Sequence, residues 1–186
     1  MVRLIENEEP ELAGILAVAR LFLLRMPSEA VPLQWNGPRS TVHLEEAQAT
    51  IVLTKRKNRP TPTTLVRKCC CHTTGRHLCA VHWLHFLRRK RGTHPLVFGL
   101  PVHYVRQRMK QLAQEAEVVD WVHVGTRSLR RGMAQDIIDS GNSLAVLLKA
   151  GGWSSAAFLD CLRADQASDA AVSQALIYLS DSEEDA

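Results

Sequence analysis

The C-terminal third of this chain constrains its fold most, because it is patterned as short helices separated by glycine turns. Apolar residues recur at Leu129, Met133 and Ile137, a spacing that places them on one face of a helix. The pair Gly151-Gly152 then interrupts the pattern, and glycine is typical of helix ends. Helices are therefore predicted over residues 129–139, 143–150 and 154–163.

The remaining sequence predicts a mixed α+β fold, mainly α, with a small antiparallel hairpin sheet. Helices are expected over residues 11–24, 79–91 and 101–117, and short strands over residues 41–44, 49–54, 63–67 and 117–124. Residues 11–164 are expected to form one domain, preceded by an acidic segment over residues 1–10. One more helix is expected over residues 165–179, followed by an acidic, disordered tail over residues 180–186.

Composition excludes several classes of protein. The chain has 186 residues and no run of eighteen apolar residues, so a membrane span and a membrane partner are not expected. Its five cysteines are odd in number and include three in a row, Cys69 to Cys71. Adjacent thiols are not typical of a secreted disulfide framework, and they favour a reducing, intracellular setting.

The distribution of charge indicates a polyanionic partner. The formal net charge is only +4, but residues 47–114 contain no Asp or Glu and fourteen Lys or Arg. A segment of one charge sign suits a nucleic-acid backbone, because neutralising phosphates releases condensed counterions. A solvated basic surface is the simpler alternative. We expect sequence-nonspecific binding to double-stranded DNA through this window.

The segment from residue 126 to 163 reads TRSLRRGMAQDIIDSGNSLAVLLKAGGWSSAAFLDCLR and resembles the catalytic core of tyrosine recombinases. The likeness is to phage-integrase-like domains, especially the retroelement-like eukaryotic type. Arg130 matches the second catalytic arginine of that family, and Trp153 lies in the matching glycine-rich turn. Cys161 occupies the position of the nucleophilic tyrosine. The resemblance implies a helical catalytic core with a small hairpin sheet.

The same resemblance extends to the N-terminal half of the chain. Arg25, which precedes Ser28-Glu29, looks like the first catalytic arginine, and Lys57 looks like the hairpin lysine. The alternatives are a cation at a helix end for Arg25 and a packing indole for Trp153. Lys55 competes with Lys57 for the role of the hairpin lysine, and either could be only a phosphate contact. Further DNA contacts are expected from Lys55, Arg59, Arg88, Arg89, Lys90, Arg91, Arg127 and Arg131.

Two departures from the family predict impaired catalysis. Arg127 replaces the usual histidine, and a cysteine side chain at 161 is shorter than tyrosine by most of a ring. Cys161 shares an apolar face with Phe158 and Leu162, which favours a buried free thiol over a nucleophile, and Tyr178 is a distant substitute. We expect a nuclear DNA-binding protein of DNA recombination or mobile-element integration, acting as a homo-oligomer or with a full-length relative. The family's N-terminal DNA-clamping domain is not expected in this sequence.

Cys69, Cys71, Cys79 and His82 are a second constellation with metal-ligand character. Four soft or borderline ligands in two close pairs suit a structural, tetrahedral Zn²⁺, although buried thiols would have the same pattern. No cofactor is required for the recombinase chemistry itself. The alternative function is a small zinc-containing nucleic-acid-binding module without recombinase ancestry. That alternative predicts that Arg25, Lys57 and Arg130 lie far apart.

Overall fold

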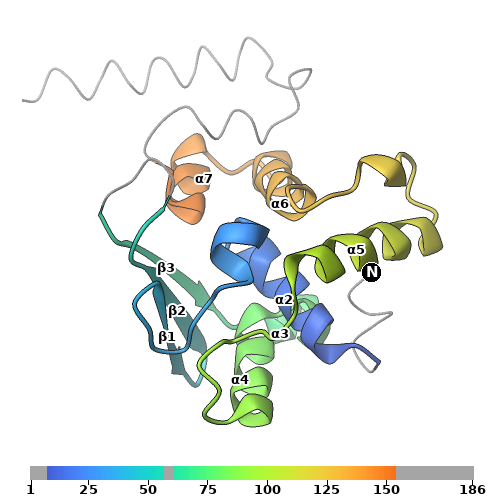
Figure 1. Cartoon of the computed structure of the whole chain (residues 1–186). Coiled ribbons are helices and arrows are strands. Elements are labelled where there is room, and N and C mark those ends of the chain that lie inside the picture. Colours follow the sequence, from blue (N-terminus) through green and yellow to red (C-terminus); the bar gives the residue numbers. More distant parts are fainter. Residues whose placement is uncertain (1–7, 57–60, 154–186) are drawn as a thin grey trace, which may run out of the picture.

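A computed structural model describes residues 8–56 and 61–153 of the chain. The longer elements are α2 (Pro10–Leu21), β1 (Ser40–Glu45), β2 (Gln48–Leu53), β3 (Thr63–Lys68), α4 (Ala80–Arg91), α5 (Val102–Glu115), α6 (Ser128–Asp139) and α7 (Leu144–Gly151) (Figure 1). Short helical turns are η1 (Met26–Ala30), α3 (Cys71–Thr74), η2 (Arg76–Leu78) and η3 (Trp121–His123). The predicted α+β class is confirmed. The helices predicted after residue 153 and the acidic tail lie outside the described residues.

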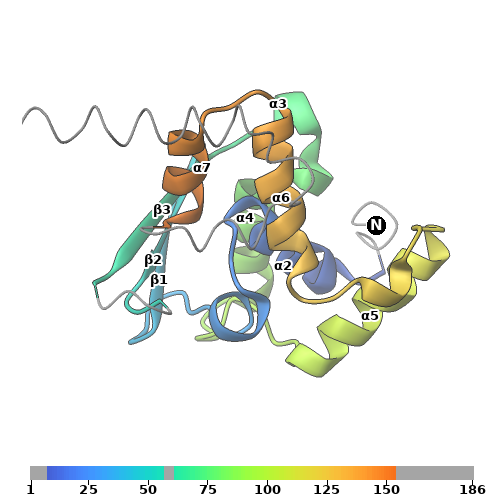
Figure 2. The ribbon, with the colours of Figure 1, turned by 90° about the horizontal axis from the view of Figure 1, so that it is seen from above.

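The helix α2 is the centre of the core. Its residues from Leu12 to Ala19 are all buried, because apolar side chains occur around nearly the whole helix. Helix α4 packs against it closely, since a Cβ at Gly14 would lie 2.9 Å from a Leu87 methyl carbon. Helix α6 packs on α2 as well, and Figures 1 and 2 place α6 and α7 on the side of α2 away from α4.

Leu23 ends α2 in an unusual backbone conformation. Its φ of 53° lies in the left-handed region, which leucine rarely adopts. The amide of Leu24 donates to Ala19 O and that of Leu23 to Arg20 O, so a leucine takes the place that glycine has in most such helix ends. Burial compensates the strain, because the Leu23 side chain packs in a second apolar cluster with Ala134, Ile137 and Leu147.

The three strands form an antiparallel sheet in the order β1-β2-β3. Their register aligns Val42, Ile51 and Leu65 in one buried row across the sheet. This face packs against α4, which contacts all three strands. The alternation of buried and more exposed residues along β2 is the pattern expected of a half-buried strand.

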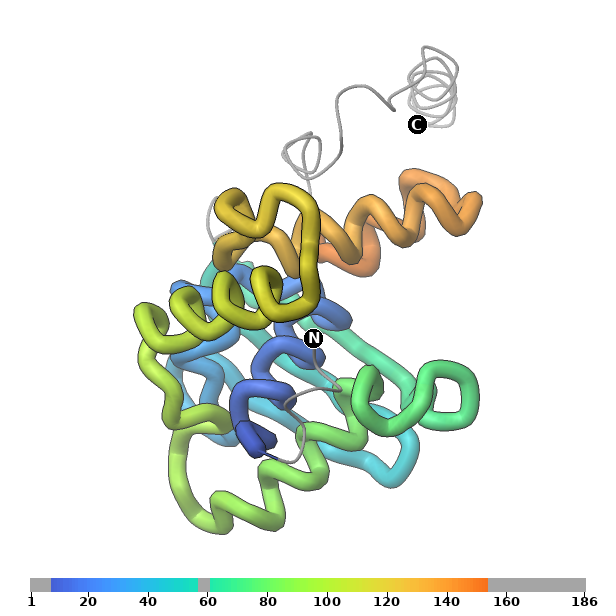
Figure 3. Tube along the Cα trace, turned by 90° about the vertical axis from the view of Figure 1, so that its right-hand side faces the viewer, coloured from blue at the N-terminus to red at the C-terminus, as the bar shows by residue number. Residues whose placement is uncertain are grey.

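The strand predicted over residues 117–124 is wrong. Glu117 and Asp120 both have positive φ, at 51° and 63°, and this breaks any extended backbone. The segment instead reverses the chain between α5 and α6, and η3 packs back on α5 (Figure 3). Val119 is 85% exposed. The apolar residues of the segment 117–124 therefore do not form a buried strand. No helix within the described ranges is long and apolar enough to cross a bilayer.

Candidate functional site

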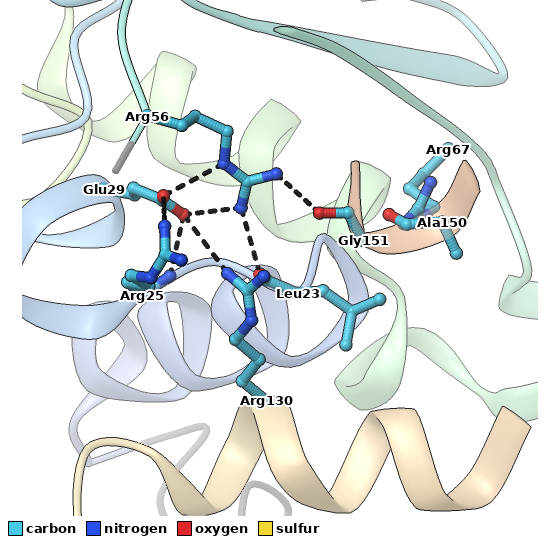
Figure 4. Close-up of polar contacts among 8 residues, drawn as sticks. All are labelled: Leu23, Arg25, Glu29, Arg56, Arg67, Arg130, Ala150 and Gly151. Carbon is cyan, nitrogen blue, oxygen red and sulfur yellow. Dashed lines mark hydrogen bonds and ion pairs between the residues drawn. The ribbon is translucent and has the colours of Figure 1, made fainter. Parts of the chain in front are cut away.

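A buried carboxylate, that of Glu29, organises the candidate site. Glu29 lies in η1 directly after α2, and its side chain is only 4% exposed. One carboxylate oxygen accepts from Arg25 Nη1 at 2.9 Å and from Arg56 Nε at 3.0 Å. The other accepts from the Arg25 backbone amide at 2.9 Å and from Arg56 Nη2 at 2.8 Å. Figure 4 shows these side chains meeting at Glu29 from different parts of the fold.

Arg130 is the third arginine at Glu29. It is buried in the first turn of α6, and its Nη1 lies 3.7 Å from Glu29 Oε2. A helix dipole disfavours a cation in the first turn, so this placement depends on a nearby anion. The Arg130 guanidinium also lies over the ring of Trp153, with Cζ 4.4 Å from the ring centroid. Three guanidiniums therefore face one carboxylate, a local excess of positive charge.

Two arginines of the sheet region attach α7 to the cluster. Arg56 Nη1 donates to Gly151 O at 2.6 Å, and Arg67 Nη2 donates to Ala150 O at 2.6 Å. Both carbonyls are in the last turn of α7, where cations complement the helix dipole. Burial lowers the pKa of Arg67 below its ordinary value. The contacts fix the end of α7, and with it the following Trp153, beside Arg130.

The glycine pair at the end of α7 is a steric requirement of this packing. Gly152 has a φ of +60°, and a Cβ there would lie 2.8 Å from both Arg56 Nη1 and a Thr63 methyl carbon. A Cβ on Gly151 would overlap the ring of Trp153. The Gly-Gly-Trp sequence thus allows both the arginine contact and the indole contact.

Glu29 is ionised in this setting. Burial raises its pKa, but the hydrogen bonds and charge of Arg56 and Arg25 outweigh burial and hold the pKa below its usual value. A carboxylate with several donors is strongly stabilised in its charged form. Glu29 therefore remains negative near neutral pH and holds the arginines in place.

The structure brings together three of the residues expected from the sequence: Arg25, Arg130 and Trp153. Lys57, Arg59 and Cys161 lie outside the described residues. Lys55 is exposed immediately before Arg56. Sequence reasoning missed two central residues, Glu29 and Arg56. The spacing of four between Arg25 and Glu29 was a signal for an ion pair, whereas nothing marked Arg56 as the buried cation of its basic run.

The remaining predicted DNA contacts differ in their surroundings. Arg88, Arg89 and Lys90 are exposed in the last turn of α4, and Arg127 and Arg131 are exposed on either side of Arg130. Arg91 differs, because it is half-buried and paired with Glu11 at 2.7 Å.

Glutamates from the N-terminal region offset part of the basic window. Arg91 pairs with Glu11, and Arg108 of α5 pairs with Glu9. The hydrogen bonds that Arg108 donates to Glu9 are the main reason why the pKa of Glu9 is lowered. The positive field of the window is therefore weaker than its sequence suggests.

A group of thiols lies away from the arginine cluster, where β3 leads into α4. The Sγ atoms of Cys69, Cys71 and Cys79 are all within 4.8 Å of one another. Burial opposes ionisation of Cys79, but hydrogen bonds from the backbone of His82 and Cys70 and from the other thiols lower its pKa to about 7. Burial and the same thiol contacts raise the pKa of Cys71 to about 12. The expected fourth ligand, His82, is not part of this close group.

No family model, curated protein or solved structure matches this chain.

Proposed function

We propose that this chain is a DNA-binding protein of the tyrosine recombinase and integrase type, with impaired chemistry. The observation that carries the proposal is the convergence of Arg25 and Arg130 on Glu29. These arginines are distant in sequence, and their motifs alone predict them as site residues. Their convergence beside Trp153 supports a phosphate-binding site of the recombinase type.

The chemistry of the cluster fits a phosphodiester. Transfer of a phosphoryl group depends on donors that stabilise charge on the non-bridging oxygens, and guanidiniums are well shaped for that contact. Arg25 is the most accessible of the three arginines, with 31% of its side chain exposed, whereas Arg56 and Arg130 are almost fully buried. Arg25 is therefore the group proposed to contact a phosphate directly, while Arg56 holds the carboxylate that aligns it.

The proposed DNA interface extends from this cluster over exposed cations. Arg127 immediately precedes α6, Arg131 follows Arg130 on that helix, and Lys55 precedes Arg56. Contacts of this kind supply affinity without reading sequence. The proposed setting is nuclear, in DNA recombination or integration of a mobile element, with a second copy or a full-length relative on the same DNA.

A small zinc-containing nucleic-acid-binding module is the second candidate function. The grouping of Cys69, Cys71 and Cys79 favours it. It accounts for a structural zinc but not for the meeting of Arg25 and Arg130, which it expects to lie apart. The arginine cluster therefore favours the recombinase-type proposal, in which zinc has no catalytic part.

Fluorescence anisotropy with a labelled DNA duplex tests the proposal. The chain is expected to bind duplexes of unrelated sequence, and the logarithm of the association constant should fall linearly with the logarithm of salt concentration. A single strand of the same length is the matched competitor. Absence of binding at low salt would remove the proposal.

A further inference from the structure

The thiols at the junction of β3 and α4 have the geometry of a metal site. Cys69 follows β3, Cys71 is the first residue of α3, and Cys79 immediately precedes α4. Cys69 Sγ and Cys79 Sγ are 3.7 Å apart. Two sulfurs bound to one tetrahedral zinc at about 2.3 Å each lie roughly 3.8 Å apart, so this pair already has the required separation.

We infer that Cys69, Cys71 and Cys79 bind one Zn²⁺ ion as three thiolates, with a solvent molecule as the fourth ligand. The inference goes beyond the proposed function, because metal binding at the thiols neither requires nor excludes DNA binding at the arginines. Among the described residues, these three thiols alone make up the close group, and His82 is not included. Three protein ligands and one exchangeable position are an established arrangement for zinc.

Cys70 has a supporting role in this arrangement. Its backbone N–H donates to Cys79 Sγ at 3.4 Å, and such a bond orients a ligand sulfur and stabilises its negative charge. Its own Sγ accepts from Thr74 Oγ1 at 3.2 Å. The Cys70 thiol also interacts with Cys79, but its Sγ lies outside the close group of three.

The surroundings select a thiophilic ion. Residues 47–114 contain no Asp or Glu, so the segment supplies no carboxylate for the oxygen-loving ions Mg²⁺ and Ca²⁺. Thiolates favour zinc and other soft metals. The ligand types therefore agree with the distances.

The ion would fasten a weakly packed part of the fold. Between Cys71 and Cys79 the chain has only short helical turns, reverses at Gly75 with a φ of 77°, and leaves Leu78 exposed. Cys69 continues the sheet, since its amide donates to Ala47 O at 2.7 Å. A metal bound to both Cys69 and Cys79 would link the end of the sheet to the residue before α4. Because the metal would bind only the folded state, it would raise the melting temperature of the chain.

Cobalt titration of the full reduced chain tests the site. Every sample carries Cys161→Ser, which removes the one thiol outside residues 69–79. One Co²⁺ per chain should give a sulfur-to-metal charge-transfer band, and Zn²⁺ should displace it. Cys69→Ser and Cys71→Ser, at half-buried positions, should each lower the band by about a third or abolish binding, since three thiolates bind the ion. Cys79→Ser should do the same, with circular dichroism to check its fold.

Cys70→Ser and His82→Ala are the matched controls, and both should retain one bound ion and the full band. The inference is overturned if the reduced chain binds no metal, or if either control loses as much of the band as Cys69→Ser. Because the readout is spectroscopic and needs no DNA, its failure is distinct from failure of the DNA-binding proposal.

Discussion

The guanidinium of Arg130 lies on the indole ring of Trp153, with Cζ 4.4 Å from the ring centroid. This contact joins the first turn of α6 to the residue that follows α7 and its glycine pair. A desolvated cation over an indole is worth about 2 kcal/mol, so the ring contributes to the placement of the arginine. Trp153 is thus both a packing residue and one wall of the arginine cluster.

Trp153→Ala is expected to lower the free energy of unfolding by about 2 kcal/mol and to weaken DNA binding, because Arg130 loses its aromatic support. Trp153→Phe, which keeps a ring at this position, should have a smaller effect on both. Urea unfolding and anisotropy measure the two quantities. Equal losses for Ala and Phe would show that the ring contact does not position the arginine.

Glu29→Gln should destabilise the chain by about 3 kcal/mol at pH 7, since it removes a buried charge that arginines surround. The pKa of Glu29 is lowered from 4.5 in the folded chain. Between this lowered value and the unfolded value of 4.5, the unfolded chain binds more protons at Glu29 than the folded chain does. The stabilisation from Glu29 is therefore fully present above about pH 4.5 and is lost as the pH falls through the lower, folded value.

The pH dependence supplies the control for this variant. The difference in unfolding free energy between wild type and Glu29→Gln should shrink as the pH falls below 4.5. Urea titrations between pH 7 and pH 3 measure it. A difference that is constant with pH would mean that the ionised carboxylate of Glu29 does not hold the cluster together.

Gly152→Ala is expected to destabilise the chain by roughly 1–3 kcal/mol, because residue 152 has a φ of +60° and a Cβ would press on Arg56. Gly132, inside α6, is the matched control, since a Cβ there would meet nothing within 4 Å. Gly132→Ala should stabilise by up to about 1 kcal/mol through helix propensity. Thermal unfolding of both variants distinguishes a steric requirement at Gly152 from a general effect of glycine replacement.

Under the recombinase-type proposal the chain is not expected to form a covalent adduct with DNA, since Cys161 would occupy the position of the phenolic nucleophile. A suicide duplex, nicked near the scissile phosphate, should leave no protein-linked band after denaturing electrophoresis. An adduct lost in Cys161→Ser would show that the thiol attacks the phosphodiester. One lost in Tyr178→Phe would identify the distal phenol instead.

Much of the fold could be predicted from local pattern. Helices α4, α5 and α6 and the three strands begin and end within about two residues of the predicted positions. Helix α2 ends three residues earlier than predicted, because Leu23 adopts a left-handed conformation that its sequence does not signal. The strand expected over residues 117–124 failed because apolar content does not show whether a partner strand exists.

The site was predicted only in part, for physical reasons. Motif spacing selected Arg25 and Arg130, but it did not show that Glu29 would be their common partner. The basic run around Arg56 has three similar cations, and which of them turns inward depends on carbonyls of α7 that are distant in sequence. The pairing of Arg91 with Glu11 is likewise a tertiary effect.

The affinity of Arg25→Ala for duplex DNA tests the central claim most directly. Arg25 is proposed to contact a phosphate, so its removal should weaken binding by about tenfold and reduce the slope of the salt dependence by about one. Arg20→Ala is the matched control, because Arg20 is also partly exposed and paired with an acid, Asp136, but lies outside the cluster. The account predicts a large loss for Arg25→Ala and little change for Arg20→Ala; wild-type affinity and salt slope in Arg25→Ala would contradict it.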